Sequence, residues 1–308
     1  DVVFNTTTGG TPPTTFVDAT AADFGRGSPD ASIYTSLMAD GELTLQPTVA
    51  SEFTNPVVPT GWSTLPWTAG SSVVVGGGVA AIDGLRLYTD ATFSTTRSLE
   101  FSATFSGAPY EHVGFGVTLD DAPWAIFSSG PGDGLYARTN NGTSSSFTRL
   151  PGNWFGAPHR FRIDSTASGV VYAIDGVQVA SDAIVLTANV RPIASDYASD
   201  GTSLKVDWLR MTPYASAATY TSRIFDAAAT VSWTGLTWTG EQPAGTSVVV
   251  SVRSGDTPTP DGSWTPFATV TNGTVNTRGR YLQYRVDLST SNPARTPVVA
   301  DVTVSYQP

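Results

Sequence analysis

The clearest alternation of hydrophobic and polar positions lies between Arg97 and Phe127. Apolar and polar side chains alternate over residues 99–105, and residues 112–119 repeat the pattern with Val113, Phe115, Val117 and Leu119 as the apolar set. A period of two places each set on one face of a β-strand, so the apolar faces must cover a core. Residues 122–129 are apolar on both faces and carry Trp124, which predicts a third strand.

The polar face of the second of these strands is nearly bare. Gly114 and Gly116 stand where side chains would otherwise project. A bare strand face indicates a close approach, either by a neighbouring backbone or by a ligand. The sequence leaves both alternatives open.

Short strands separated by turns continue on both sides of this stretch. Asp175-Gly176 predicts a two-residue hairpin turn within residues 170–180. No ten-residue stretch has a good helical period, so the pattern predicts an all-β protein. Further strands are expected at residues 32–37, 42–45, 73–75, 79–82, 85–88, 135–139, 147–150, 159–164 and 204–211.

The pattern divides the chain into three parts. Residues 1–15 are rich in Thr, Gly and Pro and predict a linker or arm. Residues 16–213 are assigned to a larger domain with its core at about 52–213, and residues 220–308 to a smaller β-sandwich. Residues 16–47 fit either the first edge of the larger sandwich or a separate arm.

Composition removes several classes of function. The net charge is −10 and Lys205 is the single lysine, which argues against nucleic acid and anionic membranes as partners. No apolar run approaches the roughly 20 residues that cross a bilayer, so we expect no membrane insertion. The absence of cysteine excludes thiol catalysis, disulfides and thiolate metal sites. We expect a processed piece of a secreted or cell-surface bacterial protein, since the chain begins at Asp1 and prefers arginine to lysine.

Two segments resemble a known superfamily. HRFRIDSTASGVVYAIDGV, from His159 to Val177, and VDWLRM, from Val206 to Met211, resemble the concanavalin A-like lectins and glucanases. The resemblance covers about residues 52–213 and implies a jelly-roll sandwich, a fold that hosts binding modules as well as enzymes. Residues 280–306 resemble β-sandwich modules of secreted bacterial proteins, which implies an immunoglobulin-like second domain.

The resemblance also implies where catalytic acids would lie. Glucanases of this superfamily carry a Glu-X-Asp-X-(X)-Glu motif on one strand, so that two carboxylates project together about 5 Å apart. The corresponding segment here is residues 122–129, which offers no carboxylate pair on either face. Asp120 and Asp121 are adjacent and would point to opposite faces of an extended strand. We therefore expect the glucanase chemistry to be absent.

Several residues are candidates for binding a sugar. Aromatic rings stack on the apolar faces of pyranoses, and hydroxyl groups need polar partners. Each candidate also has a plain alternative, such as a core tryptophan, a solvated strand face or a sheet cap. The candidate ligand-binding residues are His112, Trp124, Tyr136, Arg138, Asn140, Trp154 and Phe155.

Calcium is the one cofactor that the residues leave open. Asp120, Asp121 and Asp133 supply oxygen ligands of the kind that calcium prefers, although turn chemistry explains them equally well. No other cofactor is expected.

The sequence thus favours a non-catalytic secreted or surface module that binds a polysaccharide or other glycan through its larger domain. A structural or adhesive segment without a small ligand, associated with other domains of a larger extracellular protein, is the first alternative. A glycoside hydrolase or polysaccharide lyase with an atypical site, built on His112, Asp120 or Asp121, is the second.

Overall fold

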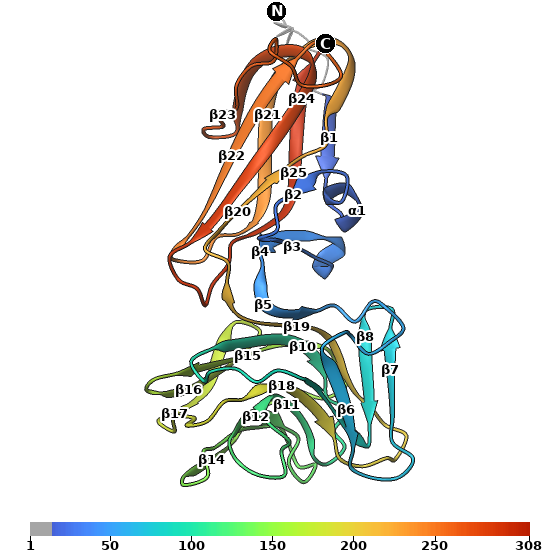
Figure 1. The fold of residues 1–308 in the computed structure, drawn as a ribbon, viewed down its shortest axis with the longest axis vertical. Coiled ribbons are helices and arrows are strands. Elements are labelled where there is room, and N and C mark those ends of the chain that lie inside the picture. Colours follow the sequence, from blue (N-terminus) through green and yellow to red (C-terminus); the bar gives the residue numbers. More distant parts are fainter. Residues whose placement is uncertain (1–13) are drawn as a thin grey trace, which may run out of the picture. The chain divides into compact units, whose positions relative to one another are not determined.

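The computed structural model describes residues 14–308, which form two compact units (Figure 1). One unit comprises residues 47–213, and the other combines residues 14–46 with 214–308. The predicted all-β class is confirmed, because the helical elements described are the short α1 (Ala21–Phe24) and the 3₁₀ turn η1 (Met38–Asp40). Within residues 14–308, no helix is long and apolar enough to cross a membrane.

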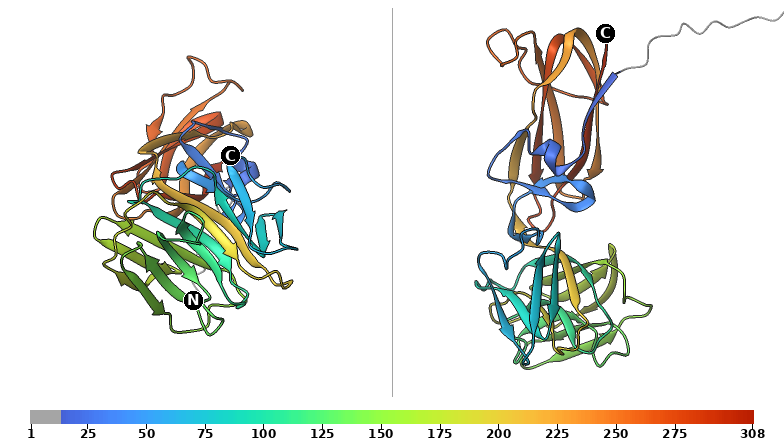
Figure 2. Two further views of the ribbon diagram at one scale, coloured as in Figure 1. Left: turned by 60° about the horizontal axis from the view of Figure 1, so that its bottom comes forward. Right: turned by 90° about the vertical axis from the view of Figure 1, so that its right-hand side faces the viewer.

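The larger unit is a sandwich of two antiparallel sheets (Figures 1 and 2). One sheet has eight strands in the order β17-β16-β15-β10-β19-β8-β7, with β5 beside β19. Its strands are β5 (Pro47–Ser51), β7 (Ser72–Gly76), β8 (Val79–Asp83), β10 (Ser98–Thr104), β15 (His159–Thr166), β16 (Gly169–Ile174), β17 (Val177–Asp182) and β19 (Leu204–Tyr214).

The facing sheet has seven strands in the order β14-β13-β12-β11-β18-β9-β6. They are β6 (Trp62–Pro66), β9 (Leu85–Thr89), β11 (Glu111–Gly116), β12 (Trp124–Ser128), β13 (Tyr136–Asn140), β14 (Ser145–Arg149) and β18 (Arg191–Asp196). This arrangement agrees with the predicted jelly-roll sandwich, and it divides the three central strands between the sheets, since β10 belongs to the first and β11 and β12 to the second.

The core between the sheets is built from the predicted alternation. Phe101 on β10 stacks on Phe161 of β15, with ring centroids 5.3 Å apart, and both rings are fully buried. Phe127 on β12 meets Phe161 at 4.8 Å and so joins the two sheets. Burial of large apolar rings is the main contribution that such a core makes to stability.

The bare face of β11 is closed by the protein's own chain. A Cβ atom on Gly114 would lie 2.3 Å from the carbonyl oxygen of Ala125, so the close neighbour there is the adjacent backbone. At Gly116 the same atom would lie 2.6 Å from the side chain of Leu119. Leu119 does not continue β11 toward the core, because the strand ends at Gly116 and Leu119 has a φ of 65°.

The predicted hairpin joins β16 and β17. Asp175 and Gly176 have φ values of 50° and 81°, as a type I′ turn requires. The Asp175 carboxylate accepts a hydrogen bond from the Arg160 backbone N–H at 2.9 Å and contacts His159 Nδ1 at 2.8 Å. The residues that carry the superfamily resemblance therefore hold the edge of the eight-stranded sheet in place.

The smaller unit consists of one ten-stranded sheet that curls around its own core to form a near-barrel. Its main path runs β2-β20-β24-β21-β25-β4-β3, with β1 beside β25, and β22 beside β23 and β24. The strands are β1 (Thr14–Asp18), β2 (Ser28–Pro29), β3 (Ile33–Ser36), β4 (Glu42–Leu45), β20 (Ala217–Thr221), β21 (Phe225–Glu241), β22 (Thr246–Gly255), β23 (Ala268–Thr269), β24 (Thr274–Thr290) and β25 (Val298–Gln307).

The assignment of residues 16–213 to one domain needs correction. β3 and β4 form at the predicted places, but β4 pairs with β25 through Leu43 and Val299, and β1 also pairs with β25. Phe24 and Leu43 lie in the core of the smaller unit. Alternation correctly marks these strands, but it cannot show that their partner lies some 250 residues later in the chain. Of the predicted linker at 1–15, residues 1–13 lie outside the described part, and Thr14 and Thr15 belong to β1.

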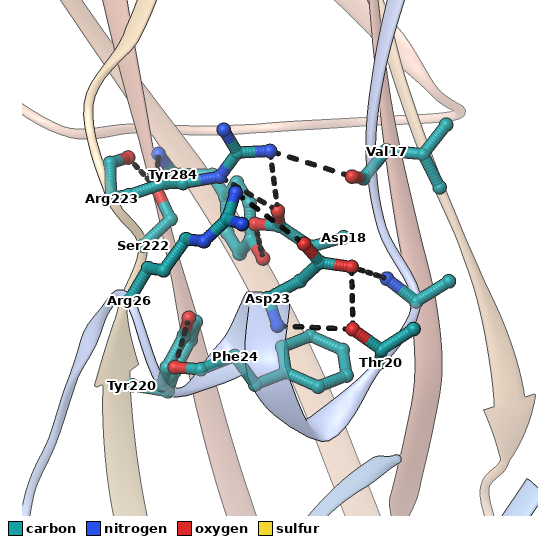
Figure 3. Close-up of polar contacts among 11 residues, drawn as sticks. Val17, Asp18, Thr20, Asp23, Phe24, Arg26, Tyr220, Ser222, Arg223 and Tyr284 are labelled. Atoms are coloured by element: carbon teal, nitrogen blue, oxygen red, sulfur yellow. Dashed lines mark hydrogen bonds and ion pairs between the residues drawn. The ribbon is translucent and has the colours of Figure 1, made fainter. Parts of the chain in front are cut away.

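A buried polar cluster fastens the N-terminal segment to the smaller unit (Figure 3). The fully buried Asp18 carboxylate accepts hydrogen bonds from the Tyr284 hydroxyl at 2.8 Å and from Arg223 Nε at 2.9 Å. Next to it, Thr20 caps α1 by accepting the backbone N–H of Asp23 at 3.1 Å. Burial raises the pKa of Asp18, and the bonds from Tyr284 and Arg223 oppose this effect. We call Asp18, Arg223 and Tyr284 the Asp18 cluster.

Candidate functional site

The outer face of the seven-stranded sheet gathers several of the predicted site residues. Val113 and Phe115 turn inward, so His112 projects from the opposite face of β11. In the register of the sheet, His112 lies opposite Ser128 of β12 on one side and Ser195 of β18 on the other. Tyr136 and Arg86 extend this polar row on the next strand at each end.

A pocket of about 450 Å³ opens at the Arg86 end of this row. The Trp67 and Tyr197 ring centroids are 5.3 Å apart, and Tyr110 lies 6.1 Å from Tyr197. Tyr110 and Tyr197 are 44% and 49% exposed, so their rings are available to a ligand. The residues lining this aromatic pocket are Trp67, Tyr110, His112, Leu119, Asp120 and Tyr197.

Trp67 is held in a fixed orientation. Its indole N–H donates to Ser195 Oγ at 2.7 Å, and the guanidinium carbon of Arg86 lies 3.7 Å from the ring centroid. Arg86 itself is buried and pairs with Asp120 at 2.5 Å. The positive charge of Arg86 therefore balances the negative charge of Asp120, and the ion pair stabilises one wall of the aromatic pocket.

His112 contributes a neutral imidazole to the aromatic pocket. Burial, with a smaller contribution from the nearby Arg138 cation, lowers the pKa of His112 to about 3. Its Nδ1 is buried and has no hydrogen-bond partner among residues 14–308. At neutral pH, His112 can exchange hydrogen bonds with a ligand, but it is not a proton donor of the imidazolium type.

A second aromatic group lies on the same face at the other end of the row. The Arg138 guanidinium carbon is 5.0 Å from the Trp124 ring centroid and 4.2 Å from that of Phe147. The Tyr172 hydroxyl, which comes from the facing sheet, donates to the backbone carbonyl of Arg138 at 2.7 Å and anchors β13. We call Trp124, Arg138 and Phe147 the arginine stack.

Trp124 offers little surface to a ligand, because it is only 8% exposed and packs edge-on against Phe147. Tyr136 remains on the polar row, where its hydroxyl donates to the Asp133 carboxylate at 2.9 Å. Asn140 is engaged in a turn, since its side chain accepts the Gly142 N–H at 2.8 Å. The binding roles of these residues stay predictions.

Trp154 and Phe155 lie elsewhere in the larger unit. Both pack against the core between the sheets. The Trp154 indole N–H donates to the Pro151 carbonyl at 2.9 Å, and its ring meets His159 at 5.1 Å. Neither lines the aromatic pocket, so the structure does not bring this predicted pair together with His112.

The candidate calcium ligands are occupied in part by other contacts. Asp120 pairs with Arg86, and Asp133 accepts the Tyr136 hydroxyl. Asp121 is exposed. No three His, Asp or Glu side chains converge on a possible metal position within residues 14–308. The structure therefore adds no support to a calcium site at these residues.

Two carboxyl groups do come together, but inside the sandwich. Glu111 of β11 and Asp196 of β18 are cross-strand neighbours, and both are fully buried. Glu111 accepts the backbone N–H groups of Ser106 and Gly107, each at 3.1 Å. Burial raises the pKa of both groups, and the negative charge of Glu111 contributes to a pKa of about 7 for Asp196. Neither carboxyl group reaches the surface, and Glu111 holds the loop after β10.

Sequence reasoning identified His112 on the outer face but missed most of the aromatic pocket. Trp67, Tyr110 and Tyr197 all lie just outside strands, where no alternation assigns them to a face. The only signal was the concentration of proline and aromatic residues in 52–67, which ends at Trp67.

Comparison with known proteins gives distant structural matches. No family model and no curated protein matches the sequence. A native glycosidic hydrolase is similar at 12% identity, with a TM-score of 0.41, over 54% of this chain and 96% of that chain. An immunostimulatory antigen and pseudo β-1,3-glucanase of Mycobacterium tuberculosis has 14% identity and a TM-score of 0.42, over 54% of this chain and 98% of the other. The β-glucanase of Bacillus licheniformis has 14% identity and a TM-score of 0.38, over 53% and 96%.

At these identities and TM-scores the matches assign neither a superfamily nor an activity or ligand to this chain. The larger unit itself is a two-sheet β-sandwich with an aromatic pocket on the outer face of one sheet.

Proposed function

We propose that this protein is a non-catalytic secreted or cell-surface module that binds a glycan on the outer face of the seven-stranded sheet. The observation that carries the proposal is the aromatic pocket, in which two half-exposed tyrosines and Trp67 surround a space of about 450 Å³. Ligand pockets are typically of this size and combine aromatic walls with a few polar groups. His112 and the Arg86–Asp120 pair supply such groups.

The carboxyl groups support binding in preference to hydrolysis. Asp120 is the one acid among the residues that line the aromatic pocket, and Arg86 holds it in an ion pair. Glu111 and Asp196 lie inside the sandwich, with no exposed surface. A retaining hydrolase needs two carboxyl groups on opposite sides of the scissile bond. Release of reducing sugar from a bound polysaccharide would therefore contradict the non-catalytic part of the proposal.

Replacing Tyr197 by alanine tests the pocket directly. Tyr197→Ala is expected to weaken binding about five- to tenfold, because loss of one stacking ring removes about 1 kcal/mol. The measurement is affinity electrophoresis of the purified chain through gels that contain single polysaccharides, followed by calorimetric titration of those that bind. Thermal unfolding should hardly change, because the ring is 49% exposed.

Val177→Ala provides the matched control, since Val177 is 66% exposed and lies on β17 of the opposite sheet. Equal affinity of the two variants would place the binding surface elsewhere. Failure to bind any polysaccharide in a broad panel would favour a structural or adhesive segment without a small ligand.

A further inference from the structure

Arg138 is one of four arginines of the larger unit that form no ion pair in the described part of the chain, and the other three, Arg97, Arg149 and Arg191, donate to backbone carbonyls, whereas Arg138 does not. Its guanidinium carbon lies over both rings of the arginine stack, 5.0 Å from the Trp124 centroid and 4.2 Å from the Phe147 centroid. No carboxylate within residues 14–308 forms an ion pair with it. The arginine ion pairs described in this unit are Arg86–Asp120, Arg160–Glu100, Arg162–Glu100, Arg162–Asp164 and Arg210–Glu52.

The donors of Arg138 are largely unused. A guanidinium carries five N–H donors. Among the described residues, the one side-chain acceptor for them is Ser128 Oγ, which Nη1 reaches at 3.2 Å, and the buried Nε has no partner. Burial lowers the pKa of Arg138, and within residues 14–308 Tyr110 alone opposes this effect. Burying a cation without a counter-charge costs free energy, and pairing with an anionic ligand would offset this cost.

Neighbouring polar groups converge on the same place. Ser128 accepts from Arg138 and lies opposite His112 in the register of the sheet. The Nδ1 of His112 is also buried, with no hydrogen-bond partner in the described part of the chain, and His112 belongs to the aromatic pocket as well. The polar row therefore runs without interruption from the aromatic pocket to Arg138.

We infer that the glycan bound by this face is acidic and that its anionic group, a carboxylate or a sulfate ester, binds Arg138 beside Ser128 and His112. This inference rests on the proposed function. The planar guanidinium forms charge-assisted hydrogen bonds with oxyanions of both kinds. Because the protein carries a net charge of −10, long-range attraction does not explain such a preference, and it must come from this local site.

The test compares acidic with neutral polysaccharides on the full chain. Polygalacturonate and alginate present carboxylates, carrageenan presents sulfates, and dextran, galactan and mixed-linkage glucan are neutral. At least one acidic polymer is expected to bind at least about tenfold more tightly than every neutral one. A charge-assisted hydrogen bond contributes a binding free energy of this size. Whether the carboxylated or the sulfated polymers bind identifies the anionic group.

Arg138→Gln should remove this preference, while Arg278→Gln should retain it. Arg278 is an exposed arginine of the smaller unit, so its loss changes the net charge equally. Arg138→Lys keeps the charge without the planar fork and is expected to retain part of the preference, which provides a second readout if Arg138→Gln folds poorly. Circular dichroism and thermal unfolding identify that case.

The outcomes separate the two proposals. Binding of neutral polymers as tightly as acidic ones, or an acidic preference that survives in Arg138→Gln, overturns the inference and leaves glycan binding intact. Absence of binding to every polymer, neutral or acidic, overturns the proposed function itself and the inference with it.

Discussion

Asp196→Asn is expected to stabilise the larger unit at pH 8 by about 4 kcal/mol, and to change its stability little at pH 4. The pKa of Asp196 is raised to about 7, first by burial and then by the negative charge of Glu111. A shift of one unit corresponds to about 1.4 kcal/mol. Asparagine resembles the protonated acid in shape and carries no charge, so the variant avoids the cost of ionising a buried group.

The sign follows from proton binding. The folded state keeps a proton on Asp196 that the unfolded state, with its lower pKa, has already lost. The free energy of unfolding therefore falls as the pH rises from about 4 to about 7 and is constant above this window. Below pH 4 both states are protonated, and the group has no effect on stability.

Denaturant unfolding of wild type and Asp196→Asn across pH 4 to 8 measures this difference. Carboxyl groups other than the neighbouring Glu111 titrate equally in both proteins and cancel in the comparison. Asp121→Asn is the control, since Asp121 is exposed and also loses one negative charge. A stability difference that is independent of pH, or that favours wild type at pH 8, would show that Asp196 is ionised in the folded protein at little cost.

Asp18→Ala is expected to destabilise the smaller unit by about 3 kcal/mol. The substitution leaves the Tyr284 hydroxyl and the Arg223 guanidinium without their buried partner (Figure 3). Breaking a buried ion pair on one side typically costs about 3–5 kcal/mol, and the partial exposure of Arg223 places this case at the lower end. Tyr284→Phe removes a single hydrogen bond and should cost about 1 kcal/mol.

Hydrogen exchange locates the effect. In Asp18→Ala, the amides of β1 and of the paired residues 302–306 on β25 should lose protection first, because Asp18 ends β1. Asp261→Ala, an exposed turn residue of the same unit, serves as the control. If Asp18→Ala is as stable as this control, the Asp18 cluster does not fasten the N-terminal segment.

Local patterns predicted the strands more successfully than their partners. The alternation around Phe101 and Phe115 correctly marks two core-facing strands, and Asp175-Gly176 marks the hairpin, because each signal depends on neighbouring residues. The place of residues 16–46 depends instead on pairing between Leu43 and Val299, which no local pattern encodes. The domain boundary was therefore misplaced although the strands themselves were found.

The same distinction holds for the candidate site. Strand alternation placed Tyr136, Arg138 and Asn140 on one face, and the structure keeps them there. The aromatic pocket is assembled from residues on or next to β6, β11 and β18 and from the segment after β11, and the order β11-β18-β9-β6 brings them together. The sequence also does not show which group lies against a glycine. At Gly116 this neighbour is the side chain of Leu119, which only the fold reveals.

Nuclear magnetic resonance of the full chain, titrated with an oligosaccharide of whichever glycan binds, tests the central claim most directly. Because the Trp67 indole N–H donates to Ser195 at the wall of the aromatic pocket, its signal should shift on binding, together with the amides of Tyr110, His112 and Tyr197. Shifts confined to the eight-stranded sheet or to the smaller unit, with these signals unmoved, would contradict glycan binding on the outer face of the seven-stranded sheet.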